Sequence, residues 1–384
     1  LGEFEAGQFS TTTKLTGKYQ FVAGAVQSDD KSNHDNAVTL NYSSTWNLNT
    51  SFNGRDRLYT RIKTGNFSSS GPFTDKDKGT YLSAAKDSGN AIKVDKLWYE
   101  FPVGDSVKVW VGPEIENYYM LASAPSIYKP VLKGFALGGN GGAYGASTAQ
   151  GVGFAWTQQV DDRSQPRFAV SSNVVHKNGD SANADAGGGI FTDNQSAWLT
   201  KVEYGSPRWQ VSLAVNEKMC DKEESRANNE TCFDGGSYFS TAEGKNRTGN
   251  STNYGLRAYW KPETTGMVPS FQVGYDWSTV DDDGAQASTE ETEGWMIGAM
   301  WKDAFIDGNT LGVAYGKRQY ASDVVDGSDD PSDDNNIWEV YYDFKVSDSI
   351  TVTPAIFGGT DTKNAAGSDQ DDFFGGLVQT TFKF

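Results

Sequence analysis

Residues 38–48 read VTLNYSSTWNL and indicate the fold class of the chain. The apolar side chains all stand at even positions, Val38, Leu40, Tyr42, Trp46 and Leu48, whereas the odd positions are polar. An alternation of period two indicates a β-strand with one apolar and one polar face. The same alternation recurs in residues 209–216, 254–260, 271–277, 295–301, 311–315, 338–344 and 350–356. The sequence therefore predicts an all-β protein.

The composition excludes several classes of protein. Aromatic residues make up 13% of the 384 residues, too many for a disordered chain. No segment approaches about 18 consecutive apolar residues, so no transmembrane helix is predicted. The net charge of −17 argues against nucleic acid as a partner. With two histidines and two cysteines the chain lacks the usual zinc ligands, and we predict no metal and no cofactor.

Aromatic residues stand at the ends of many of the apolar faces, and smaller aliphatic side chains occupy the centres. A strand that crosses a bilayer needs this arrangement, because aromatic rings favour the two membrane interfaces. A soluble β-sandwich, such as an adhesin, also alternates, but its strands are usually shorter. We therefore predict that the apolar faces meet lipid, with the soluble adhesin as the alternative.

Short and long connections alternate strictly along the chain. The short ones span residues 50–56, 104–105, 158–165, 205–207, 262–269, 303–309 and 346–349. The long ones span residues 27–37, 66–91, 113–150, 176–195, 217–252, 280–294, 319–336 and 358–372. This pattern predicts a closed transmembrane antiparallel β-barrel of about 16 strands, with long extracellular loops and both termini periplasmic. A barrel of this size encloses a water-filled lumen.

The longest connection, residues 113–150, is the first candidate for a functional segment. Its Gly-rich, weakly charged composition differs from that of the acidic loops, so we predict that it folds into the lumen and narrows it. The alternative is an exposed lid. The side chains of this constriction loop that we single out are Glu114, Glu116, Tyr118, Tyr119, Tyr128 and Lys133.

Basic residues on the polar strand faces are the second candidate. The predicted pore-wall residues are Arg57, Arg61, Lys63, Lys108, Arg167, Arg208 and Arg257. Lys and Arg around a narrow pore favour anions. The alternative is that these charges pair with acids or only solvate the wall.

Three further features carry less weight. Cys220 and Cys232 fall in one long loop, where an oxidising compartment favours a disulfide over two free thiols. Acidic runs within residues 281–293 and 323–334 lack the EF-hand spacing and are predicted to be solvated rather than to bind divalent cations. Both histidines fall in loops, so no nucleophile pair is available and we predict that the protein is not an enzyme.

Residues 8–15, QFSTTTKL, and the terminal Phe384 resemble the cyanobacterial major outer-membrane porins, within the carbohydrate-selective porin family B. The resemblance implies a homotrimer and passive diffusion of small solutes. It also implies that residues 1–10 are the remnant of a periplasmic linker and residues 11–384 the barrel. In that family a preceding S-layer-homology domain binds cell-wall polysaccharide, and that domain is absent from this sequence. General porins use the loop equivalent to residues 66–91 as a latch on a neighbouring subunit.

The sequence thus predicts a diffusion porin of the bacterial outer membrane, surrounded by lipid and lipopolysaccharide. It would pass inorganic ions and small hydrophilic solutes and favour anions. The alternative is a substrate-specific porin for carbohydrate or iron uptake. No sugar-stacking aromatic ladder is identifiable by spacing.

Overall fold

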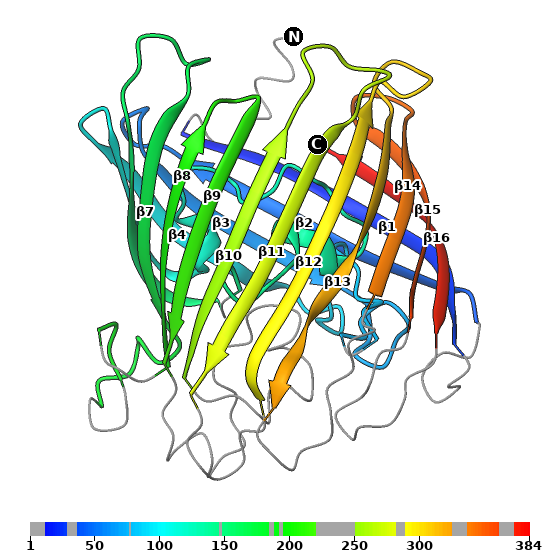
Figure 1. Ribbon diagram of the computed structural model, residues 1–384, viewed down its shortest axis with the longest axis horizontal. Helices are drawn as coiled ribbons and strands as arrows, with labels where there is room; N and C mark the ends of the chain where they lie inside the picture. Colours follow the sequence, from blue (N-terminus) through cyan, green and yellow to red (C-terminus); the bar gives the residue numbers. More distant parts are fainter. Residues whose placement is uncertain are drawn as a thin grey trace.

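The computed structural model describes residues 12–28, 37–76, 78–145, 148–183, 188–191, 195–219, 250–281, 289–324, 336–360 and 372–384. Sixteen antiparallel strands pair in sequence order in this part of the chain, and β1 pairs with β16 to close a barrel (Figure 1). The predicted barrel and its strand number are confirmed. The elements are β1 (Thr13–Ser28), β2 (Thr39–Thr50), β3 (Arg57–Gly65), β4 (Lys93–Val103), β5 (Val107–Ile115), η1 (Asn117–Tyr119), η2 (Lys133–Gly138), β6 (Ala149–Thr157), β7 (Arg167–His176), β8 (Ser196–Gly205), β9 (Trp209–Lys218), β10 (Ser251–Trp260), β11 (Ser270–Val280), β12 (Thr289–Lys302), β13 (Thr310–Val324), β14 (Asn336–Lys345), β15 (Ile350–Thr360) and β16 (Phe373–Lys383).

The two ends of the barrel differ, as the alternation of connection lengths predicts. The short turns and the C-terminus lie at one rim, which we call the short-turn rim, and the long connections leave the opposite rim (Figure 1). At the short-turn rim the chain end closes the barrel, because the N–H groups of Gly17 and Phe384 each donate to the other residue's carbonyl oxygen, over 2.9 and 3.1 Å.

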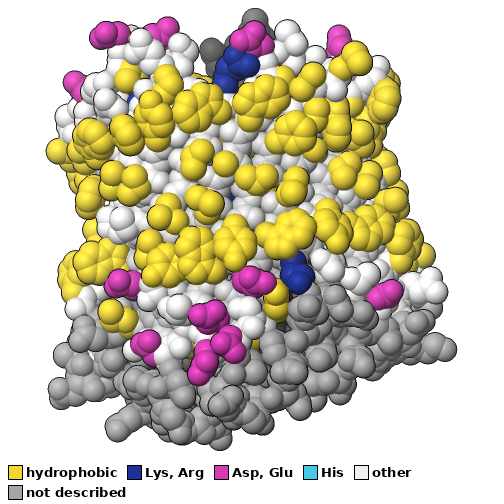
Figure 2. Space-filling view, in the orientation of Figure 1, with side chains coloured by type: hydrophobic (Ala, Val, Ile, Leu, Met, Phe, Trp, Pro, Cys, Tyr) yellow, Lys and Arg dark blue, Asp and Glu magenta, His cyan; other side chains and the backbone are white. Residues whose placement is uncertain are grey.

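Large apolar side chains form two belts around the outside of the barrel, with smaller apolar and polar surface between them (Figure 2). The exposed aromatic rings of the described residues include those of Trp198, Tyr204, Trp209 and Phe271. This is the distribution that a bilayer with two interfaces selects. None of the helices in the described residues is long and apolar enough to cross a membrane.

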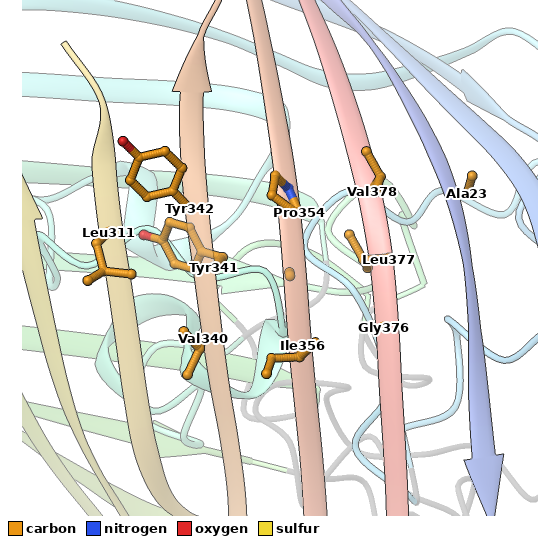
Figure 3. Close-up of a pocket in the computed structure, with 11 residues that line it drawn as sticks. Ala23, Leu311, Val340, Tyr341, Tyr342, Pro354, Ile356, Gly376, Leu377 and Val378 are labelled. Carbon is orange, nitrogen blue, oxygen red and sulfur yellow. The ribbon is translucent and has the colours of Figure 1, made fainter. Parts of the chain in front are cut away.

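The outer wall is hollowed where the barrel closes. A groove of about 540 Å³ crosses β13 to β16 and β1, and Pro354, Gly376, Val378 and Ala23 line it (Figure 3). The hollow arises because the outward residues here, Gly376 and Ala23 above all, are small where other strands carry large side chains.

The second long connection, residues 66–91, packs inside its own barrel. Phe67, Phe73 and Leu82 are buried in one apolar cluster with Val22 of β1 and Phe135 of η2. Phe67, Phe73 and Leu82 therefore do not form the latch on a neighbouring subunit that the resemblance implies, which corrects that expectation for these residues. The physical reason is that their apolar side chains find a partner surface in the lumen, where the constriction loop offers the matching apolar residues.

Candidate functional site: the lumen constriction

The constriction loop lies against the inward faces of the barrel wall. Polar side chains from seven strands, β7 to β11, β13 and β14, bond to its main chain. Four loop N–H groups donate to wall side chains, and the pairs are Ala122 to Ser171, Ile127 to Gln272, Gly142 to Gln319, and Leu132 to Glu339. Three wall side chains donate to loop carbonyls, and the pairs are Lys201 to Ser123, Asn216 to Ala143, and Arg257 to Leu137. Each such bond is typically worth about 1 kcal/mol. Their distribution fixes the loop along its whole path rather than at one hinge.

Glu339 of β14 is the most heavily used of these wall groups. Its fully buried carboxyl accepts the Tyr128 hydroxyl at 2.9 Å and the main-chain N–H groups of Val131 and Leu132 at 3.2 and 2.6 Å. Charge-assisted bonds of this kind are about twice as strong as neutral ones. Tyr128, predicted as a constriction-loop residue, therefore anchors the loop to the wall and is itself buried.

A glycine permits the closest approach of loop and wall. Gly274 of β11 faces the loop, and a Cβ built at this position would overlap the carbonyl oxygen of Gly138. No side chain can be accommodated here unless the loop moves. On the outer face, by contrast, a Cβ at Gly376 would lie 3.8 Å from its nearest neighbour, the carbonyl oxygen of Ala355.

We expect Gly274→Ala to displace the constriction loop and to raise the single-channel conductance, because main-chain overlap with Gly138 leaves no other relief. Gly376→Ala is the matched control, with a new methyl group in ordinary contact, and should conduct like the native channel. Planar-bilayer recordings of both variants, after gel migration has shown folded barrels, make the comparison. A folded Gly274→Ala channel of native conductance would contradict this account of the loop.

A cluster of charged side chains lies beside β3 and β4. Arg61 pairs with Asp95 at 2.5 Å, and Lys86 of the second loop reaches the same carboxylate at 2.9 Å. The electrostatic neighbours of Lys63 are Arg61, Asp95, Lys133 and Lys86. We call these five residues the eyelet cluster. Four basic side chains and one carboxylate give it a formal net charge of +3.

Asp95 reaches the lumen through an irregularity in strand pairing. Arg61 is opposite Lys96 and Ile62 is opposite Val94, so Asp95 is the extra residue of a β-bulge. Sequence reasoning missed Asp95 because strict alternation assigns it to the lipid face. One signal was present, since a charged side chain on the lipid face of a strand is costly. Lys86 was missed because its loop was expected to lie outside the barrel.

The predicted pore-wall residues fall into three groups. Arg61 and Lys63 belong to the eyelet cluster. Arg57 and Lys108 share the carboxylate of Glu100, at 2.9 and 2.7 Å.

The third group lies either beneath the constriction loop or at the short-turn rim. Arg257 is 2% exposed, lies beneath the constriction loop and bonds both carboxylate oxygens of Asp276 at 2.8 Å. It therefore anchors the loop and does not line the open lumen, which corrects its predicted place. The other two residues, Arg208 and Arg167, lie at the short-turn rim. Arg208 pairs with Glu263, and Arg167 donates a hydrogen bond to the carbonyl of Arg163. Arg257 was assigned to the open pore wall because the sequence does not show which basic side chains the constriction loop covers.

Two of the remaining constriction-loop residues, Tyr118 and Tyr119, belong to a row of aromatic rings. The row runs Tyr59–Trp98–Tyr119–Tyr118, with centroid distances of 4.2, 4.9 and 4.4 Å. Glu116 accepts the Tyr118 hydroxyl at 2.7 Å and lies 3.3 Å from Lys96.

These rings pack against one another at tilted angles, and the Arg57 guanidinium lies 5.2 Å from the Tyr59 ring. The row therefore does not offer a set of open faces to a sugar. Lys133 lies 5.0 Å from the Tyr81 ring, and Glu114 is half-buried at the end of β5. Cys220 and Cys232 lie outside the described residues.

Comparison with known families gives a match over the full chain. The profile described as "Carbohydrate-selective porin, OprB family" matches residues 1–384. An uncharacterised protein of Nostoc sp. is 26% identical over 415 residues, which cover 100% of this chain and 67% of that protein. One from Synechocystis sp. is 30% identical over 136 residues, 35% of this chain and 24% of that protein. These matches confirm the resemblance that residues 8–15 and Phe384 indicated.

Solved structures support the fold. Pseudomonas putida OprB, in a high-pH structure, has a TM-score of 0.62 at 13% identity, over 100% of this chain and 97% of that one. Salmonella typhi OmpF, in a complex with daunomycin, has a TM-score of 0.61 at 11% identity, over 97% of both chains. The trimer form of Vibrio cholerae OmpT has a TM-score of 0.55 at 11% identity, over 97% of this chain and 99% of that one. At these identities the likeness concerns the fold alone.

Proposed function

Because the chain belongs to the OprB family of carbohydrate-selective porins, we propose that it is a diffusion porin that passes small hydrophilic solutes and favours anions. Family and fold support an outer-membrane channel rather than an enzyme. The observation that carries the anion preference is the net charge of +3 in the eyelet cluster. Charge acts most strongly where a pore is narrow, because less water and salt screen it there.

The reversal potential of native channels in a KCl gradient tests this preference. We expect the sign of an anion-selective pore. The acidic loops oppose it by enriching cations at the wide mouth, but their field is screened over about 8–10 Å. A cation-selective sign would show that these acids govern the current.

A carbohydrate-specific channel is the second candidate, and the family description favours it. The aromatic row disfavours it, because Trp98 is enclosed between Tyr59 and Tyr119. Adding sugars to a bilayer recording separates the two functions. A specific channel is blocked by its sugar at sub-saturating concentration, whereas a diffusion pore is not.

We further propose a homotrimer in the outer membrane, with the short-turn rim and both termini in the periplasm and lipid and lipopolysaccharide around the assembly. Residues 11–384 would form the pore and residues 1–10 the end of a linker. The groove at Ala23 and Gly376 suits a contact with a second copy, because small outward side chains let barrel walls approach closely (Figure 3). The mass of the assembly in mild detergent tests this, and a monomer would contradict it.

A further inference from the structure

A second cavity lies beside the constriction loop, toward the short-turn rim. It has a volume of about 480 Å³. The inward faces of β14, β15, β16 and β1 form its wall, and Ser83 of the second loop and residues 129–131 of the constriction loop cover it. Its charged lining residues are Lys18, Lys129, Lys383 and Asp343.

Two of these lysines are arranged unfavourably for the empty protein. Lys18 and Lys383 are direct partners across the β1–β16 pair that closes the barrel. Like charges placed directly opposite each other destabilise a strand pair. No carboxylate forms an ion pair with Lys18, Lys383 or Lys129 among the described residues.

Asp343, the one carboxylate of the cavity, is an electrostatic neighbour of Lys383 and offsets only part of this repulsion. Asp343 accepts the Thr353 hydroxyl at 2.6 Å. Three ammonium groups against one carboxylate leave the cavity with a net charge of +2. A mobile anion is the species that would balance it.

The neutral lining fits an oxyanion rather than a halide alone. Amide and hydroxyl groups of Gln20, Thr351, Gln379 and Thr381 line the same space. Such groups donate hydrogen bonds, and ammonium groups add charge-assisted bonds, so several donors can converge on the oxygens of one multivalent anion. Lys18 is also an electrostatic neighbour of Arg61, so the positive potentials of the cavity and of the eyelet cluster add.

We propose that this cavity is a binding site for a divalent oxyanion of the size of inorganic phosphate, reached through the eyelet cluster. The inference deepens the proposed anion preference and rests on it for the route by which the anion enters. The site slows such an anion on its passage, so phosphate lowers the current that chloride carries while it is bound.

The probe is inorganic phosphate at about pH 8, which lies above the second pKa of phosphoric acid, so the dianion dominates. Native channels in KCl should lose conductance as phosphate is added, whereas monovalent nitrate at equal ionic strength should have little effect. In the double variant Lys18→Gln/Lys383→Gln the half-blocking concentration should rise about tenfold, since two unit charges close to the anion are lost. Each single variant should give an intermediate value.

The matched control removes two basic residues of the short-turn rim that do not line the cavity. Arg167→Gln/Arg208→Gln takes two charges from this rim and should leave the half-blocking concentration at its native value. Equal relief of block in both double variants would overturn the site, because the effect would then come from general rim charge. Absence of block in native channels would also overturn it.

The reversal potential in KCl alone, without phosphate, keeps the two proposals apart. An anion-selective native channel that phosphate does not block retains the proposed function and rejects the cavity as a binding site. A cation-selective channel that phosphate blocks, with relief in Lys18→Gln/Lys383→Gln, retains the site and rejects the anion preference.

Discussion

Excision of residues 69–84, with a short Gly-Ser bridge in their place, is expected to raise the single-channel conductance about twofold or more, because conductance follows the open cross-section of a pore. The excised part holds Phe73 and Leu82, both about 1% exposed and packed within the barrel. It also pairs with the constriction loop, since the Ser83 N–H donates to the carbonyl of Val131 at 2.8 Å and the Lys133 N–H to that of Tyr81 at 2.8 Å. Removal of residues 69–84 therefore enlarges the open cross-section of the lumen, because the side chains of the barrel wall do not fill the space that these residues occupy.

The rest of the barrel should tolerate this excision. The base of the second loop keeps its own contacts, the bridge between Asn66 and Asp87 and the bond from the Asn90 N–H to the carbonyl of Gly65 at 3.0 Å. Glycine at Ser68 and Ser70, which keeps the loop at full length, is the control and should conduct like the native channel. An excised channel of native conductance would mean that this loop does not limit the current.

The strands of the barrel wall could be predicted from the sequence. One face of each strand meets lipid and the other meets water or a loop, and this requires the alternation of apolar and polar residues seen in residues 38–48 and in the later strands. The rule fails at Asp95, where a bulge shifts the parity by one residue. A bulge depends on the partner strand, so one strand's pattern does not reveal it.

The contacts inside the barrel were harder to predict, because the sequence does not show which wall side chains each inward-folded loop covers. Arg257 and Arg61 look alike in the sequence, each on the polar face of a strand. The constriction loop covers Arg257, which pairs with Asp276, and leaves Arg61 beside Lys63. The second loop was misplaced for the same reason. Its aromatic residues could have indicated burial, since a loop that stays in water has no need of Phe67 and Phe73.

The substitution Lys63→Glu is expected to shift the selectivity of the channel toward cations by about tenfold, because it changes the formal charge of the eyelet cluster by two units. Lys63 suits this test better than Arg61. Arg61 bonds Asp95 and the hydroxyl of Tyr119, so its loss would also disturb the loop. Lys63 forms no ion pair among the described residues, so no carboxylate loses its partner.

Two further variants make the interpretation of Lys63→Glu unambiguous. Asp95→Asn raises the charge of the eyelet cluster by one unit and should shift the reversal potential in the opposite direction. Arg167→Glu makes the same charge change as Lys63→Glu but at the short-turn rim, where wider water and salt screen it over about 8–10 Å. Its shift should be small. If Arg167→Glu moved the reversal potential as far as Lys63→Glu, selectivity would belong to the field of the whole lumen, and the eyelet cluster would lose its special role.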